Sequence, residues 1–147
     1  MTETAADPDF EPGTHPARAA NRATFTAIMD AITRGDYGAL ESMVTEDLVF
    51  ELPYGPSFMP NPVEGRAAWM AMSTQTFAMF SSFVQHVDAV YDLVDPDVLI
   101  AEYHSDAVVT HNGNAYRNRY IGVLRFRDGQ VCAWKEFHNP EATQALA

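Results

Sequence analysis

The hydrophobic residues in the first third of the chain recur with a helical period. The i, i+3, i+4, i+7 spacing of one buried helical face is met by Phe25, Ile28, Met29 and Ile32. This pattern predicts a helix from about Pro16 to Thr33, which Arg34 and Gly35 end with a last-turn cation and a glycine. A second, shorter helix follows, in which Asp36 can be the N-cap and one side carries Leu40, Met43 and Val44.

Polar and apolar residues then alternate, which indicates a strand over Leu48 to Leu52 that ends at Pro53. Residues 53–64 are predicted to form a stiff loop, because they include Gly55 and the prolines Pro53, Pro56, Pro60 and Pro62. A third helix is predicted from Gly65 to about Phe80. One face of this helix carries Trp69, Met72, Thr76 and Met79.

The rest of the chain alternates with a period of two and predicts four strands. They span about residues 83–94, 98–110, 115–126 and 130–139. Turns fall at Asp95-Pro96-Asp97, Asn112-Gly113 and Asp128-Gly129, of which the last two are strong hairpin signals. Helices followed by an antiparallel meander indicate an α+β fold, in which three N-terminal helices pack on a curved antiparallel sheet. Such a sheet forms a cone with a central pocket, where a small molecule can bind.

The composition narrows the class of protein. The chain has 147 residues, 47% of them hydrophobic, which indicates one soluble domain over 15–147, preceded by a flexible arm over 1–14. Nine Lys and Arg against 20 Asp and Glu give a formal charge of -11, which argues against nucleic acid and anionic membranes as partners. The single cysteine, Cys132, excludes an internal disulfide. No secretory signal and no apolar run of about 20 residues is visible, so we expect a cytoplasmic protein.

The two faces of the predicted strand 115–126 differ sharply. One row holds Tyr116, Asn118, Tyr120, Gly122, Leu124 and Phe126, and the other, continued by one residue, holds the arginines Arg117, Arg119, Arg125 and Arg127. Four arginines cannot share an apolar interior, so we expect the tyrosine row to face the pocket. If Asn112-Gly113 forms a two-residue turn, Asp106 lies opposite Arg119. The outer face then gains Glu102, His104 and Asp106. We favour them as partners of the arginines over a functional constellation of the same three residues.

The turn at Asp128-Gly129 decides which way the last strand faces. A two-residue type I′ turn would place Trp134, Glu136 and His138 on the outer face. A three-residue loop with Gly129 in the left-handed region forms a G1 bulge and turns the same residues inward. We favour the bulge, in part because Lys135 then joins the arginine-bearing face.

Glu136 and His138 are the candidate acid/base residues. They lie two positions apart on one strand and therefore point the same way. In an apolar cavity the pKa of the carboxyl rises and that of the imidazole falls, so the pair can move protons on a bound molecule. The alternative is that Glu136 is paired with an arginine and His138 is merely hydrogen-bonded. His86 is a further candidate, although alternation groups it with Asp88 and Asp92 on the solvent side.

Other chemistry leaves no signature in the sequence. There is no glycine-rich phosphate loop, no G-x-S-x-G and no H-E-x-x-H. Only His86, His104 and His138 are placed to converge with a carboxylate, and their spacing matches no metal motif. We therefore expect neither a metal nor a cofactor.

Several segments resemble the SnoaL-like, nuclear-transport-factor-like cone superfamily. They are Gly35-Asp36, Val49 to Pro53, Gly65, Tyr116-x-Asn118-x-Tyr120, Phe126 to Val131 and Glu136 to Pro140. The likeness covers nearly the whole chain after residue 15 and implies the same cone fold. Within the superfamily the chain is most similar to phenazine-biosynthesis A/B-type proteins and SnoaL-type polyketide cyclases, through Asn21-Arg22-Ala23-Thr24 and the ending Glu136-Phe137-x-Asn139-Pro140.

The resemblance also implies roles for residues. In the phenazine group the glutamate of that ending lies in the pocket and acts as an acid/base, which implies this role for Glu136 and supports the bulged turn. No position here matches the partner histidine of that group. The ketosteroid isomerase branch is disfavoured because Ile28, Leu52 and Gly122 fall where its catalytic residues would stand. The arginine and two aspartates of limonene epoxide hydrolases are not found. Members commonly dimerise through the outer sheet face, which implies a homodimer that uses the arginine row.

These observations predict a small-molecule isomerase, cyclase or dehydratase that transfers protons without a cofactor. Its substrate is expected to be a hydrophobic cyclic or aromatic metabolite, with Glu136 as the principal acid/base, assisted by His138 or His86. The expected substrate-binding residues are Trp134, Tyr120, Asn118, Trp69, Met72 and Tyr54. The alternative is a non-catalytic small-molecule-binding or scaffold protein of the same fold.

Overall fold

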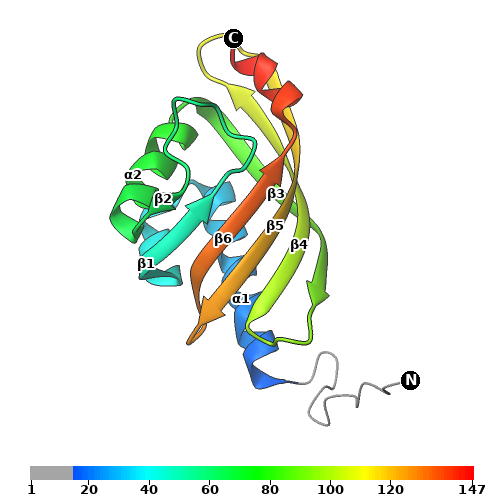
Figure 1. Cartoon of the computed structure of the whole chain (residues 1–147). Helices are drawn as coiled ribbons and strands as arrows, with labels where there is room; N and C mark the ends of the chain where they lie inside the picture. The colour runs from blue at the N-terminus through cyan, green and yellow to red at the C-terminus, as the bar shows by residue number, and fades with distance from the viewer. Residues whose placement is uncertain (1–14) are drawn as a thin grey trace, which may run out of the picture.

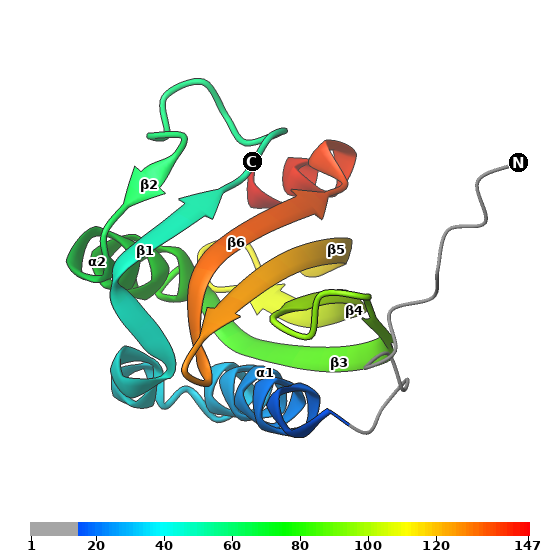
Figure 2. The same cartoon turned by 60° about the horizontal axis from the view of Figure 1, so that its bottom comes forward.

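Six strands form one curved sheet, and helices cover one of its faces (Figure 1). The structure is a computed structural model that describes residues 15–147; the flexible arm predicted over 1–14 lies outside these residues. The strand order is β2-β1-β6-β5-β4-β3. Helix α1 packs on β3 and helix α2 packs on β1, and Figure 2 shows how the sheet bends around them. The predicted α+β cone is confirmed.

Helix α1 spans Pro16–Arg34, close to its predicted bounds. His15 caps its first turn, accepting a hydrogen bond at Nδ1 from the backbone N–H of Ala17 at 3.2 Å. Gly35 ends the helix with a left-handed φ of 71°, a conformation that glycine adopts without strain. The predicted buried face is confirmed, since the core includes Phe25, Ile28, Met29 and Ile32.

The segment between the two α-helices contains more regular structure than was predicted. A 3₁₀ helix, η1, spans Tyr37–Met43, and the side chain of Asp36 makes no capping bond. Strand β1 spans Val44–Glu51 and so begins before Leu48. The proline-rich loop contributes a two-residue strand, β2 (Val63–Glu64), which pairs with β1.

Helix α2 spans Arg66–Phe77 and is shorter than predicted. Its buried residues are Trp69 and Ser73, while Met79 is exposed beyond its end. The chain then enters β3 directly at Phe80. The helix ends early because residues 80–82 pair with β4 instead.

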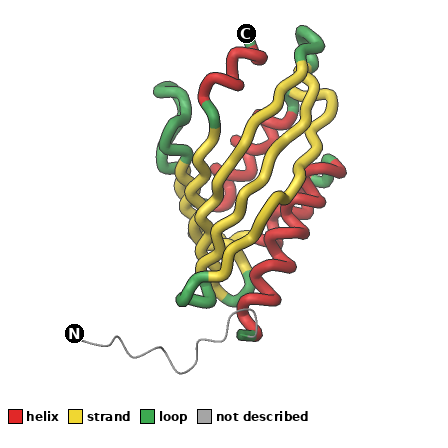
Figure 3. Tube along the Cα trace, turned by 90° about the vertical axis from the view of Figure 1, so that its right-hand side faces the viewer, coloured by secondary structure: helices red, strands yellow, loops and turns green. Residues whose placement is uncertain are grey.

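Four long strands complete the sheet, as predicted (Figure 3). They are β3 (Phe80–Asp92), β4 (Val98–Val109), β5 (Ala115–Arg127) and β6 (Gln130–His138), and a short 3₁₀ helix, η2 (Pro140–Leu146), follows. Neighbouring long strands are antiparallel, whereas β1 joins β6 in parallel. The tyrosine row of β5 is buried and its arginine row is exposed, as the alternation predicted.

The β4–β5 hairpin has a different register from the predicted one. Asp106 lies opposite Arg117, and His104 lies opposite Arg119. The connection is therefore longer than the two-residue Asn112-Gly113 turn that would place Asp106 opposite Arg119. Because the shift is by two residues, Asp106 and His104 remain on the outer face with the arginines.

The turn between β5 and β6 is shorter than the predicted one. It is a two-residue turn, with φ of 52° at Asp128 and 77° at Gly129, so the predicted three-residue loop is wrong. However, a bulge follows at Cys132, because Phe126 pairs with Val131 whereas Arg125 pairs with Ala133. The extra residue reverses the alternation. The inward row therefore holds Trp134, Glu136 and His138, as predicted. The cause is the bulge at Cys132 and not a three-residue loop.

A second bulge, at Asp88, reverses the alternation along β3. Val87 pairs with Tyr103, whereas Ala89 pairs with Glu102. Beyond the bulge, Tyr91 faces outward and donates a hydrogen bond to Glu102. Asp92, which alternation grouped with the solvent side, instead pairs with Arg22 of α1 at 2.9 Å. Within residues 15–147, no helix is long and apolar enough to cross a membrane.

Candidate functional site

Glu136 and Tyr103 form the centre of the candidate site on the helix-covered face of the sheet. The Tyr103 hydroxyl donates a hydrogen bond to Oε2 of Glu136 over 2.5 Å. The indole Nε1–H of Trp134 in turn donates to the Tyr103 oxygen over 3.3 Å. These two bonds orient the carboxyl group and leave its second oxygen without an assigned protein partner among the described residues.

A glycine makes this contact between distant strands possible. Tyr103 lies on β4 and Glu136 on β6, and the intervening β5 strand places Gly122 opposite Glu136 (Figure 1). A Cβ atom at Gly122 would lie 2.9 Å from the Tyr103 hydroxyl and 3.1 Å from Nε1 of Trp134. Only the absence of a side chain lets the Tyr103 ring pass over β5 and reach the carboxyl group.

The surroundings of Glu136 favour its neutral form. Burial raises the pKa of Glu136 to about 7, and the hydrogen bond from Tyr103 opposes this shift in part. Glu136 has no ion pair with any residue in the described part of the chain; the nearby cation Lys135 faces outward and pairs with Glu51 at 3.8 Å. Glu136 can therefore exchange a proton near neutral pH.

Tyr103 remains a hydrogen-bond donor under the same conditions. Burial and the neighbouring Glu136 hold the pKa of Tyr103 well above its usual range. Its ring stacks on Tyr120, with ring centroids 5.1 Å apart, and its edge meets Phe25 of α1. Packing on both sides holds the phenol in place.

His138 lies two residues beyond Glu136 on the same face of β6. Burial lowers the pKa of His138, which favours the neutral imidazole. Its Nδ1 atom is buried and has no hydrogen-bond partner among the described residues. A buried imidazole nitrogen without a partner is uncommon and is suited to contact with a ligand. The structure therefore brings His138 to the same site as Glu136.

Tyr120 and Asn118 are both buried on this face but differ in their remaining capacity for hydrogen bonds. The Tyr120 hydroxyl lies 3.0 Å from Oγ of Ser105. The amide of Asn118 is fully used: it bonds the Tyr116 hydroxyl and both the carbonyl and the N–H of Asn139. Asn118 thus fixes the chain at the end of β6 and has little capacity left for a ligand.

Two of the predicted substrate-binding residues, Trp69 and Met72, lie on α2 beside β6. Trp69 of α2 is buried, and its ring centroid lies 6.2 Å from that of Trp134. Met72, one turn further along α2, is partly buried against the same core. These residues connect the helix to the strand that carries Glu136.

Two predicted site residues lie elsewhere. Tyr54 is 60% exposed and packs against Phe137, with ring centroids 5.9 Å apart, next to an outward position of β6. His86 is exposed on the outer face, where it pairs with Asp106. Neither side chain is brought to Glu136, because each lies on the far side of the sheet.

Sequence reasoning missed Tyr103 and Ser105. Strict alternation along β4 places both on the face opposite Glu102, His104 and Asp106. A second signal was the glycine in the middle of β5, since glycine inside a strand marks the close approach of another group. Read together, these two signals would have pointed to Tyr103.

Two hollows of the surface lie away from this site. One of about 200 Å³ lies on the outer face between Val123, Arg125 and Lys135. Another, of about 230 Å³, lies where the end of α1 meets the beginning of β3. Neither is lined by Glu136. Glu136 itself is partly exposed, as is His138.

Comparisons with known proteins agree with the fold and with the resemblance. The family model of the SnoaL-like domain matches residues 25–134. The uncharacterized protein YesE of Bacillus subtilis is 31% identical over 119 residues, which cover 80% of each chain. The uncharacterized PhzA/B-like protein PA3332 of Pseudomonas aeruginosa is 37% identical over 95 residues, which cover 63% of this chain and 64% of the relative.

A solved structure supports the same assignment at the level of the fold. The crystal structure of a phenazine biosynthesis-related protein from Pseudomonas aeruginosa superposes with a TM-score of 0.78 at 19% identity, covering 96% of this chain and 89% of the other. The family match covers most of the chain, and the inward glutamate that the resemblance requires is in place. The chain therefore belongs to the SnoaL-like domain family.

Proposed function

We propose that this protein is a cofactor-free acid/base enzyme of the isomerase, cyclase or dehydratase type. Its substrate would be a hydrophobic cyclic or aromatic metabolite bound on the inner face of the sheet. The observation that carries the proposal is the inward-facing, partly buried Glu136, whose pKa is raised to about 7 and which has no ion-pair partner among residues 15–147. A carboxyl group in this state serves as base and as acid at neutral pH.

The neighbouring residues define how the reaction would proceed. Glu136 removes a proton from carbon or oxygen of the substrate and returns it at a second position, so no net proton is consumed. Tyr103 is a positioning residue, since its hydrogen bond holds the carboxyl group and stabilises the ionised form. His138 presents its unpartnered Nδ1 to a polar group of the substrate. Trp134 and Trp69 supply aromatic surface for a planar ring.

The family supports this class of activity without naming a substrate. Solved structures that share the fold include two described as putative polyketide cyclases and one described as an LEH-like epoxide hydrolase, all below 25% identity. Similarity at that level supports the fold alone, and one fold hosts many functions. The substrate must therefore be found by experiment.

Binding is the first measurement. The two tryptophans of the chain, Trp69 and Trp134, both lie in the site, so a ligand there changes the intrinsic fluorescence. A panel of aromatic and polycyclic metabolites is titrated against the tag-free protein, and every compound that binds is incubated and analysed by mass spectrometry and NMR. NMR also detects an isomerisation, which leaves the mass unchanged.

Turnover by the Glu136→Gln variant decides between catalysis and binding. We expect ligand affinity within a few-fold of the wild type and a rate reduced by about 10²- to 10⁴-fold, because the amide keeps the shape but cannot accept the proton. The matched control is Glu102→Gln, since Glu102 also accepts a 2.5 Å bond from a tyrosine but lies on the outer face. Binding without turnover in the wild type would identify a binding or scaffold protein and contradict the proposal.

A further inference from the structure

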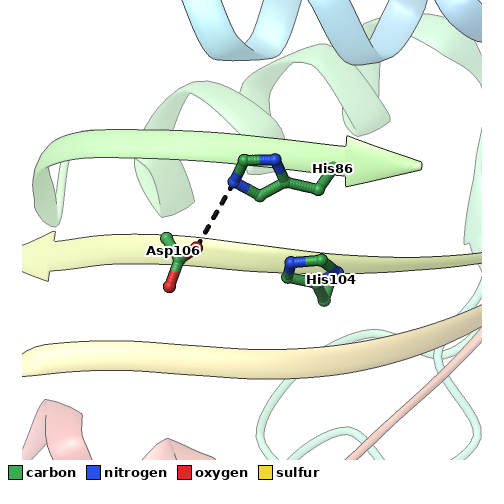
Figure 4. A group of neighbouring side chains, drawn as sticks. All are labelled: His86, His104 and Asp106. Atoms are coloured by element: carbon green, nitrogen blue, oxygen red, sulfur yellow. Dashed lines mark ion pairs between the residues drawn. The ribbon is translucent and has the colours of Figure 1, made fainter. Parts of the chain in front are cut away.

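A second cluster of chemically active side chains lies on the outer face of the sheet. His86 of β3 pairs directly with His104 of β4, and Asp106 lies two residues further along β4 (Figure 4). This face is opposite the one that carries Glu136, and the proposed reaction uses none of the three residues. His86 and His104 are 18 positions apart, a spacing that matches no metal motif, and they meet only through strand pairing.

The three donor atoms lie close enough together to converge on one metal ion. Each of the three side chains offers one ligand atom, and these atoms all lie within 4.8 Å of one another. Nε2 of His86 is 3.3 Å from Oδ2 of Asp106. Two ligands about 2.1 Å from a tetrahedral Zn²⁺ are themselves about 3.4 Å apart, so this pair is already at the required separation. The His104 ring stacks on that of His86, with ring centroids 4.7 Å apart, so one of the two rings must turn for both to reach the same ion.

The carboxylate of Asp88 supports His104 as a metal ligand. Oδ2 of Asp88 lies 2.8 Å from Nδ1 of His104. An ionised carboxylate can only accept, so Nδ1 carries the proton and Nε2 of His104 keeps its lone pair free for a cation. A carboxylate behind a ligating histidine is the usual second-layer support of metal sites. The bulge in β3 lies at Asp88, between the pairs of Val87 and Ala89.

One interaction opposes a cation. Nε of Arg117 lies 3.1 Å from Oδ1 of Asp106, the oxygen that does not face His86. Oδ2 of Asp106 remains directed at His86. Arg119 is a second cation on this face, since it lies opposite His104. The positive charge of Arg117 weakens cation binding without occupying the ligand atom.

We propose that His86, His104 and Asp106 form a binding site for a divalent transition metal of the Zn²⁺ type. Two imidazoles and one carboxylate suit such ions, whereas Mg²⁺ and Ca²⁺ prefer oxygen ligands alone. The side chains of His86 and Asp106 are about half exposed, at 46% and 50%, so the ion enters from solvent and a water molecule completes its coordination. All ligands come from one chain. The bound ion clamps the edge strand β3 to β4.

Zinc titration of the tag-free wild-type protein tests the proposal. Isothermal titration calorimetry and equilibrium dialysis should give one saturable Zn²⁺ per chain, with no comparable binding of Mg²⁺. Binding to the folded state alone should raise the melting temperature by about 5–10 °C at a hundredfold excess over Kd. We expect His86→Gln and His104→Gln each to reduce the affinity at least tenfold and to abolish this stabilisation. Asp88→Asn should reduce the affinity by about tenfold through the orientation of His104.

Two matched controls separate the site from general attraction of cations. His111→Gln removes an exposed histidine of the β4–β5 connection and should leave the affinity unchanged. Arg117→Ala should tighten binding, whereas Arg125→Ala should not, although it removes the same charge from an ion-paired arginine on the same face of β5. Circular dichroism confirms that each variant is folded. Absence of saturable binding, or equal binding by the wild type and both histidine variants, would overturn the proposal.

Discussion

Burying the carboxyl group of Glu136 destabilises the folded state to an extent that depends on pH. Its pKa is about 7 when folded, against an ordinary value of 4.5. Between these values the folded protein retains a proton that the unfolded chain has lost, so the free energy of unfolding falls as the pH rises. Above pH 7 the group is ionised in both states, and the folded protein carries the full cost of the buried charge.

This linkage predicts a difference between the wild type and Glu136→Gln. The wild type should lose about 2 kcal/mol of stability between pH 5.5 and pH 8 through this one group, and the variant, which cannot ionise, should not. Urea unfolding at the two pH values measures the difference. His138 contributes with the opposite sign, since its lowered pKa means that stability is gained as the pH rises, but this contribution is common to both proteins. Parallel curves for the two proteins would show that Glu136 is not buried as described.

The residues of the site were predictable to different degrees. Glu136 and His138 could be found because two positions on one strand share a face, whatever the turn before them. Tyr103 was missed because its contact with Glu136 reaches across β5, and no local sequence pattern indicates a contact between strands that are not neighbours. His86 was correctly grouped with the solvent side by alternation, because the pairing of β3 with β4 is regular from Phe83 to His86 and no bulge turns His86 inward.

At the scale of elements, the close approach between β4 and β6 depends on the missing side chain of Gly122. We predict that Gly122→Ala lowers the stability by about 1–3 kcal/mol, because the new methyl group overlaps with the Tyr103 hydroxyl and with Trp134. It should also raise the pKa of Glu136 further, since the displaced phenol no longer stabilises the ionised carboxyl. Urea unfolding measures the first effect, and ¹³C NMR titration of the glutamate carboxyl measures the second.

A glycine in open surroundings provides the control. A Cβ atom at Gly38 in η1 would meet no atom within 4 Å, so Gly38→Ala should change the stability little and leave the titration of Glu136 unaltered. If Gly122→Ala were as stable as Gly38→Ala and left the pKa of Glu136 unchanged, Gly122 would not be what admits the Tyr103 ring.

Helices and long strands were predictable, whereas the bulges that determine which way the strand side chains point were not. The helical period around Phe25 and the hairpin signal at Asp128-Gly129 are local patterns. Both predicted the correct positions of the helix and of the turn. The direction of Glu136 instead depends on one extra residue at Cys132, which no turn residue marks. A bulge costs little free energy and is stabilised by what it buries, here the side chain of Trp134, so only the packed structure reveals it.

At the scale of the whole molecule, the strong negative charge bears on self-association. Two copies, each with a formal charge of -11, repel each other unless they meet at a surface of different character. The outer face of β5 and β6 is such a surface, since five of the nine basic residues of the chain lie there: Arg117, Arg119, Arg125, Arg127 and Lys135. Ile121 lies in the middle of this row and is 43% exposed.

We propose that a second copy covers this face and that the protein is a homodimer. Burial of Ile121 and of the partly exposed Val123 would supply the apolar centre, and the surrounding arginines a polar rim. Multi-angle light scattering should give twice the 16.3 kDa mass for the wild type. Ile121→Glu should yield a monomer, because it would bury an unpaired carboxylate at the centre of the interface. Met79→Glu adds the same charge at an equally exposed apolar residue, 42% exposed between α2 and β3, and should leave the dimer intact. A monomeric wild type, or equal effects of the two substitutions, would exclude this face as the interface.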